Sequence, residues 1–236
     1  MYRTLDPEKV ISTLDKLNRR IDERFPQSGL GQVCGELGTL GRQTWERAEK
    51  IAQPNFILRG FVWLVILTGI CGLIYTIGLL RIERPPSEVF RFFQGMEAAM
   101  NTVFLAGAAL FSLITFEQRY KRRKALRALV EFRAIVHVID MHQLTKDPSM
   151  ILGRGPRTAS SPVREMNQFE LMRYLDYCSE MLSLTAKLAA FYTQKSNDSI
   201  VINAVNDLEI LTANLSRKIW QKITMLEAYE EKTVAS

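Results

Sequence analysis

Two long runs of the chain are predominantly apolar and contain no charged residue: Phe61 to Leu80 and Ala98 to Phe116. An α-helix rises about 1.5 Å per residue, so about 20 such residues span the roughly 30 Å hydrocarbon core of a bilayer. The alternative is a soluble protein with two buried core helices, but core helices usually keep one charged, water-facing side. The pattern therefore predicts two membrane spans, about 61–80 and 98–116, within a hairpin at residues 54–118.

The segment before the hairpin, residues 1–53, begins with a helix signal. Asp6-Pro7-Glu8 offers an N-cap, a proline at the first helical position and an acid in the first turn. Phe25-Pro26 is expected to end this helix. Four residues at helical spacing give it one apolar face: Val10, Leu14, Leu17 and Ile21.

The next stretch is rich in glycine. In a helix each glycine costs up to about 1 kcal/mol relative to alanine, unless close backbone packing compensates. We therefore expect residues 28–41 to form a tightly packed, partly irregular connection, followed by a short charged helix at 42–52. The five glycines are Gly29, Gly31, Gly35, Gly38 and Gly41.

The part after the hairpin, residues 119–236, is expected to form a cytoplasmic helical domain. A helix from Arg119 to about Lys146 continues the second span and ends at Asp147-Pro148. Residues 147–161 have the composition of a mobile basic loop. Ser161-Pro162 then marks the start of two long helices, and the short break at 196–198 between them predicts an antiparallel pair. The fold class is therefore all-α.

Each of these long helices carries an apolar stripe. The first stripe is Phe169, Met172, Leu175, Leu182, Thr185 and Ala189, and the second is Val201, Val205, Leu208, Leu215, Ile219, Ile223 and Leu226. Four further apolar residues lie off the stripes: Leu171, Met181, Leu184 and Ile210. They are expected either to contact another subunit or to cover the N-terminal helix of the same subunit.

The formal net charge of +6 is concentrated beside the predicted spans. The densest basic cluster follows the second span: Arg119, Lys121, Arg122, Arg123, Lys124 and Arg127. Because Lys and Arg near a span tend to stay in the cytoplasm, we expect a multi-pass protein of the cell inner membrane with both termini cytoplasmic. The cluster suits contact with anionic lipid headgroups. No nucleic-acid reading motif accompanies it, so nucleic acid is not an expected partner.

One broad face of the second span is polar or small along its length. It consists of Glu97, Asn101, Ala108, Ser112 and Thr115. One interpretation is that this face packs against the first span or against another copy of itself, as small and polar residues often do in membranes. The other is that several copies turn the face inward to line a water-filled pore.

The sequence gives no catalytic, metal or cofactor site. The two histidines, His137 and His142, are five residues apart, so neither a helix nor a strand points both at one ion. The three cysteines are widely spaced and form no zinc or disulfide framework: Cys34, Cys71 and Cys178. We therefore expect no cofactor and no enzyme activity.

The leading functional hypothesis is a homo-oligomeric membrane assembly, with the second span lining a channel or pore. A single two-helix hairpin encloses no path, so this hypothesis requires several copies. The competing hypothesis is a membrane-anchored adaptor or scaffold, whose helical domain recruits a cytoplasmic protein partner. The layout is similar to that of bacterial two-span proteins with helical cytoplasmic domains, but no motif links the chain to one of their families.

Overall fold

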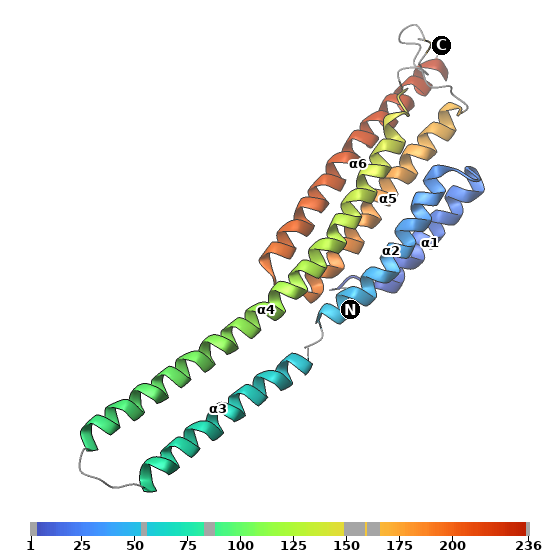
Figure 1. The fold of residues 1–236 in the computed structure, drawn as a ribbon. Helices are drawn as coiled ribbons and strands as arrows, with labels where there is room; N and C mark the ends of the chain where they lie inside the picture. Colours follow the sequence, from blue (N-terminus) through green and yellow to red (C-terminus); the bar gives the residue numbers. More distant parts are fainter. Residues whose placement is uncertain (1–3, 53–55, 83–87, 149–158, 160–165, 235–236) are drawn as a thin grey trace. The chain divides into compact units, whose positions relative to one another are not determined.

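The computed structural model describes residues 4–52, 56–82, 88–148, 159 and 166–234. These residues form six helices and no strand, so the prediction of an all-α fold is confirmed (Figure 1). The helices are α1 (Pro7–Arg24), α2 (Gly29–Ala52), α3 (Phe56–Ile82), α4 (Glu88–Leu144), α5 (Gln168–Lys195) and α6 (Ser199–Val234).

The chain divides into two compact units. The first, here called the bundle, combines Met1–Ala52 with Lys124–Ser236. The second, here called the hairpin unit, is Gln53–Arg123. Helix α4 is one continuous helix that contributes its N-terminal part to the hairpin unit and its C-terminal part to the bundle.

Helix α5 lies at the centre of the bundle, as Figure 1 shows, with α1 and α2 on one side and α6 on the other. Half of its 28 residues are buried, and they cover more than one face of the helix. Gln168 at the start of α5 donates from Nε2 to the carbonyl oxygen of Leu226 near the end of α6 (2.8 Å). Burial on several sides makes α5 the element that holds the other helices together.

Helix α4 packs into the bundle through side chains that reach three other helices. Arg47 from α2 forms an ion pair with Glu131 (2.8 Å), and the phenol of Tyr174 from α5 lies 3.2 Å from Nδ1 of His142. Lys222 from α6 donates to the backbone oxygen of Gln143 (2.9 Å). The bundle is therefore built from both ends of the chain.

The helix signals at the two ends of α1 are confirmed. The Asp6 carboxylate accepts hydrogen bonds from the backbone amides of Glu8 (3.1 Å) and Lys9 (3.4 Å), with Pro7 as the first helical residue. The helix ends at Arg24, directly before Phe25.

Helix α5 begins later than its expected start signal. Ser161-Pro162 lies outside the described residues, and the described helix begins at Gln168. Asn167 caps it by accepting from the amide of Glu170 (2.8 Å), whose carboxylate accepts from the amide of Asn167 (2.9 Å). This reciprocal capping box satisfies two amides that would otherwise lack partners.

The prediction of a partly irregular connection at residues 28–41 is wrong, because α2 runs without a break from Gly29 to Ala52. The reason is the close packing that offsets the helix penalty of glycine. A β-carbon added at Gly41 would lie 3.1 Å from both terminal methyl groups of Leu188, and one added at Gly31 would lie 2.5 Å from Oδ1 of Asp22. Gly35, in contrast, has open space beside it.

The apolar stripes of the C-terminal helices are largely confirmed. All seven stripe residues of α6 are buried, as are the last four of the six in α5. Phe169 at the start of α5 is exposed instead, and its ring contacts solvent and the guanidinium of Arg24, whose central carbon is 5.1 Å from the ring centre.

Of the four apolar residues off the stripes, three are buried and one is exposed. Leu171, Met181 and Leu184 are buried within this chain, as expected for residues that cover the N-terminal helices. Ile210 is 59% exposed.

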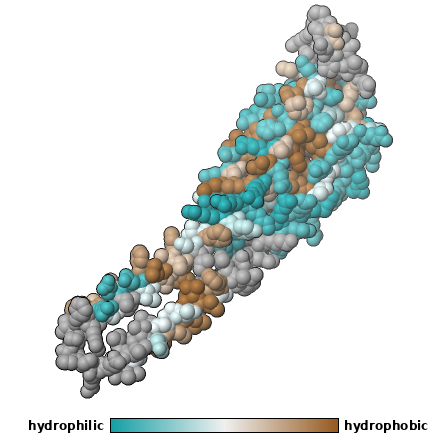
Figure 2. All heavy atoms as spheres, in the orientation of Figure 1, coloured by the Kyte–Doolittle hydropathy of each residue, from teal (hydrophilic) through white to brown (hydrophobic). Residues whose placement is uncertain are grey.

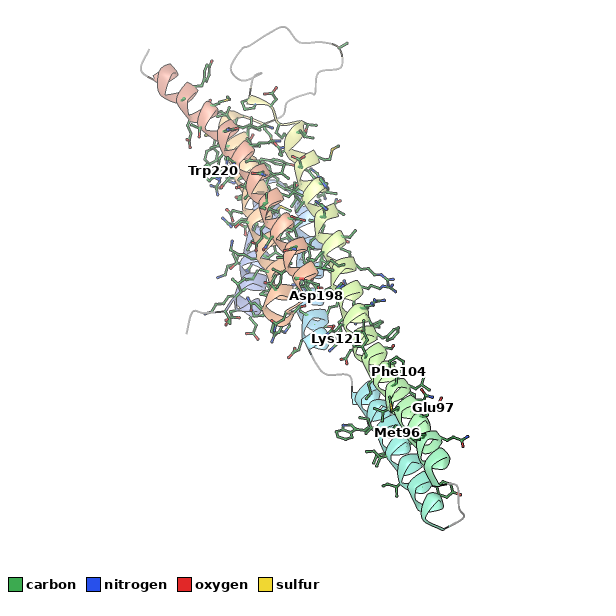
Figure 3. All side chains as sticks on the ribbon, turned by 90° about the vertical axis from the view of Figure 1, so that its left-hand side faces the viewer. Met96, Glu97, Phe104, Lys121, Asp198 and Trp220 are labelled. Carbon is green, nitrogen blue, oxygen red and sulfur yellow. The ribbon has the colours of Figure 1, made fainter. Side chains whose placement is uncertain are left out.

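The hairpin unit exposes most of its described apolar side chains. Figures 1 and 3 both draw α3 beside the N-terminal part of α4. The exposed apolar residues of α3 include Phe61, Trp63, Leu64, Leu67, Ile70, Ile74 and Tyr75, and those of α4 include Met100, Val103, Phe104, Leu105 and Phe111. Figure 2 shows hydrophobic residues on the surface of this unit.

Candidate functional site on helix α4

The N-terminal part of α4 is an exposed, predominantly apolar helix segment. Phe104, labelled in Figure 3, is 75% exposed. Within the described part of the chain, α4 alone is both long and apolar enough to cross a membrane, and none of its apolar 18-residue stretch is buried. The shorter apolar stretch Trp63–Gly72 lies in α3. The two predicted spans therefore fall on α3 and α4, and a two-span hairpin stays a prediction.

All five residues of the predicted polar face lie on this part of α4. Glu97, Asn101, Ala108 and Ser112 are exposed. Thr115 is half-buried, and its Oγ1 donates to the carbonyl oxygen of Phe111 (2.8 Å). Satisfying the hydroxyl within its own helix leaves the side chain compatible with lipid, protein or water.

Three glycines of α3 could allow a second helix to approach closely, but no such approach is seen in the described residues. A β-carbon added at Gly69, Gly72 or Gly78 would meet no other atom within 4 Å. These positions therefore offer their open side to whatever surrounds the hairpin unit rather than to another described helix.

The basic cluster lies on α4 itself, directly after the predicted span. Arg119, Arg123, Lys124 and Arg127 are exposed, and Arg122 is half-buried. Lys121 forms an ion pair with Glu117 one turn earlier (2.8 Å). Between residues 117 and 127 the six cations face one carboxylate, that of Glu117, so the cluster is strongly positive.

The bundle part of α4 has two apolar faces. One is buried in the bundle and contains Ala125, Ala128, Leu129, Phe132, Val136 and Ile139. The other, here called the outer face, consists of Val130, Ala134, Val138, Met141 and Leu144, with the exposed His137 among them. Its large members are 42–66% exposed. Sequence reasoning missed this face, although its spacing of three to four residues is the usual helical signal.

A polar cluster surrounds the end of α4 inside the bundle. Nζ of Lys222 also donates to Oε1 of Gln143 (2.6 Å), and Nε2 of Gln143 donates to Asp140 (2.6 Å). Burial lowers the pKa of Lys222. Burial and the nearby Lys146 lower the pKa of His142. The cluster fixes the end of α4 to α5 and α6, which is a structural role.

The two histidines are not brought together. His137 is exposed on α4, whereas His142 faces Tyr174. No group of three or more His, Cys, Asp or Glu side chains suited to a metal ion occurs among the described residues. Cys34 and Cys178 are buried, and burial raises the pKa of each thiol to about 12. Neither thiol is therefore disposed to act as a nucleophile.

A hollow of about 920 Å³ lies in the bundle between the start of α1 and the end of α5. Its lining includes Lys9, Lys187 and Lys195. Each of these cations already has a neighbour: Lys9 pairs with Asp6, Lys187 donates to Ser183, and Lys195 lies over the ring of Trp45. The hollow contributes a positive surface without a distinct catalytic arrangement.

Comparison with known proteins gave no match: no family model, no curated protein and no solved structure resembles the chain.

Proposed function

We propose that the chain is an integral membrane protein in which α3 and the N-terminal part of α4 form a hairpin of two spans. The exposed apolar surface of the hairpin unit carries this proposal. Keeping such surface in water is unfavourable by about 25 cal/mol per Å², and soluble proteins rarely expose large contiguous apolar areas. A lipid environment removes that penalty.

The bundle lies in the cytoplasm in this proposal, with both termini, and the host membrane is the cell inner membrane. Its basic residues beside the spans support that sidedness, since positively charged flanks tend to remain cytoplasmic. An anionic leaflet attracts each of them by about 1 kcal/mol. In the bundle, the antiparallel pair of α5 and α6 forms the framework on which the other helices pack.

The proposed activity is conduction by a homo-oligomer, with the polar face of α4 lining a central path. Asn101 and Ser112 place hydrogen-bonding groups among apolar neighbours, where water or another helix must satisfy them. Glu97, labelled in Figure 3, lies on the same helix near the end of the span distant from the basic cluster. It would stand at the outer mouth of the path.

Flux through reconstituted liposomes tests this activity. Asn101→Leu is expected to reduce flux, because it removes the amide from the path. Val103→Leu is the matched control, since Val103 is 65% exposed and lies about 200° around the helix from Asn101. Assembled wild-type particles with flux no greater than empty liposomes would contradict conduction.

A second candidate function is a membrane-anchored adaptor for a cytoplasmic protein. Trp220 favours it, because this large aromatic side chain is 51% exposed on α6 of the bundle (Figure 3). Exposed tryptophans are frequent energetic centres of protein interfaces. Replacing both spans with an unrelated hairpin should preserve function if the adaptor hypothesis is correct and abolish it if the spans conduct.

A further inference from the structure

The outer face of α4 is an unusual surface for the bundle. Val130, Met141 and Leu144 are 66%, 64% and 56% exposed, on the side of the helix opposite the buried Phe132 and Val136. Scattered exposed apolar residues need no explanation, but a row along one helix face indicates an interaction site. The face therefore lacks a partner within the described residues of its own unit.

We propose that the partner is a second copy of this chain, and that the outer faces of two α4 helices pack side by side in the same direction. This inference rests on the proposed membrane function, because copies inserted with the same sidedness present α4 in parallel. It identifies the surface that joins the subunits.

Charges beside the outer face support pairing with an identical chain. Arg133 and Glu131 flank the face on opposite sides and differ in height by only about 3 Å, or two residues. In a parallel pair related by two-fold symmetry, the Arg133 side of each helix faces the Glu131 side of its neighbour, as the two flanking positions do in coiled coils. Arg133 of one copy therefore meets Glu131 of the next.

The position of Glu131 also suits this contact. Its carboxylate accepts from Nη1 of Arg47 within the same chain (2.8 Å), which orients it on α4. Arg133 is exposed and forms no ion pair in the described part of the chain. Glu131 of the second copy thus supplies an anionic partner for Arg133.

The other expected subunit contact is less suitable. Leu171, Met181 and Leu184 are buried within the chain and are not accessible to another copy. Of these four residues, only Ile210, on α6, is exposed. It makes a matched control, because it is as exposed as Met141 but lies on another helix.

The test measures the mass of full-length protein particles in detergent and in nanodiscs. Met141→Glu is expected to convert multi-copy particles to single copies over the concentrations at which wild type stays assembled. Ile210→Glu is expected to leave the mass unchanged. A monomeric wild type, an unchanged mass for Met141→Glu, or dissociation by Ile210→Glu would each overturn the inference. Circular dichroism on the same samples verifies that the helices remain folded.

A charge exchange tests the parallel arrangement. Arg133→Glu is expected to weaken association at least tenfold, and the double variant Arg133→Glu with Glu131→Arg is expected to recover most of it. Because Glu131→Arg also removes the ion pair with Arg47, thermal unfolding must first verify that the double variant is as stable as Arg133→Glu; failure of such a double variant to recover association would overturn the parallel pairing. Ala134→Cys in a Cys71→Ser background supplies a second measurement, since parallel faces place residue 134 beside its own equivalent and permit a cross-link.

Particle mass and flux separate this inference from the proposed conduction. If Met141→Glu loses assembly and wild-type particles conduct nothing, the interface is supported. Only the proposed conduction is then contradicted. Flux from wild-type particles that contain one copy contradicts the interface instead.

Discussion

The bundle buries many of its apolar side chains, whereas the hairpin unit exposes most of its described ones. In the bundle, residues such as Leu175 and Phe132 are fully buried against other helices. In the hairpin unit, Phe104 and Phe111 are 75% and 73% exposed. The same residue types therefore stabilise the two units through different surroundings: protein interior in one, and the proposed lipid in the other.

Helix α4 contains both situations within one continuous element. Its N-terminal part exposes apolar residues on several sides, whereas its C-terminal part buries one face and carries charges beside it. The basic cluster at residues 119–127 separates the two. The backbone is therefore continuous along α4, and only the pattern of side chains changes between its two parts.

The largest expected effect comes from shortening a phenylalanine in the bundle. Phe132→Ala should lower the free energy of unfolding by about 3–5 kcal/mol, because it leaves a cavity at a fully buried site. Phe104→Ala, on the same helix, should change the unfolding of the bundle little. Chemical unfolding in detergent, followed by circular dichroism, compares the two variants. Equal losses would contradict the contrast between the units.

A charge in the predicted span gives the next largest effect. Leu105→Arg should make membrane insertion less favourable by about 2.5–3.5 kcal/mol, the penalty for arginine at the centre of a span. Val130→Arg, at a similarly exposed site in the bundle, should leave insertion unchanged. Glycosylation mapping measures both. Normal insertion of Leu105→Arg together with retention of the protein in lipid-free buffer would argue for a soluble hairpin unit.

Two glycines of α2 provide a smaller comparison inside the bundle. Gly35→Ala should raise the free energy of unfolding by about 0.5–1 kcal/mol, since its neighbourhood is open and alanine favours helix. Gly41→Ala should give no such gain, because the added methyl group crowds Leu188. Thermal unfolding of the two variants measures the difference. A similar gain for both would show that Leu188 moves aside freely.

The smallest effect concerns pH. Burial lowers the pKa of His142 below its ordinary value of 6.5, so the unfolded chain takes up a proton at higher pH than the folded chain. Bundle stability should therefore fall as pH decreases from about 7 to about 5. His142→Gln should reduce this dependence, and His137→Gln, at an exposed site, should serve as control. Identical pH profiles for wild type and His142→Gln would contradict the assignment.

Local sequence signals predicted much of the fold. Asp6-Pro7 marked the start of α1, and residues 196–198 marked the break between α5 and α6, because caps and breaks depend on neighbouring residues. The stripe of α6 was read correctly from its spacing.

Features that depend on distant residues were harder to predict. The continuity of α2 depends on Leu188, about 150 residues away from Gly41, and this contact has no local signal. The outer face of α4 was missed because a hydrophobic residue in sequence gives no indication of whether its own chain will cover it. Met141 and Ile139 look alike in sequence, yet one is exposed and the other is buried.

The central place of α5 has a consequence for biosynthesis. The ribosome completes α1 and α2 long before it reaches Lys195, the last residue of α5. Until then their apolar faces lack the helix that covers them in the finished bundle, and nascent chains with such faces are prone to aggregate. Premature termination within residues 145–167 should therefore yield products that depend on chaperones or are rapidly degraded.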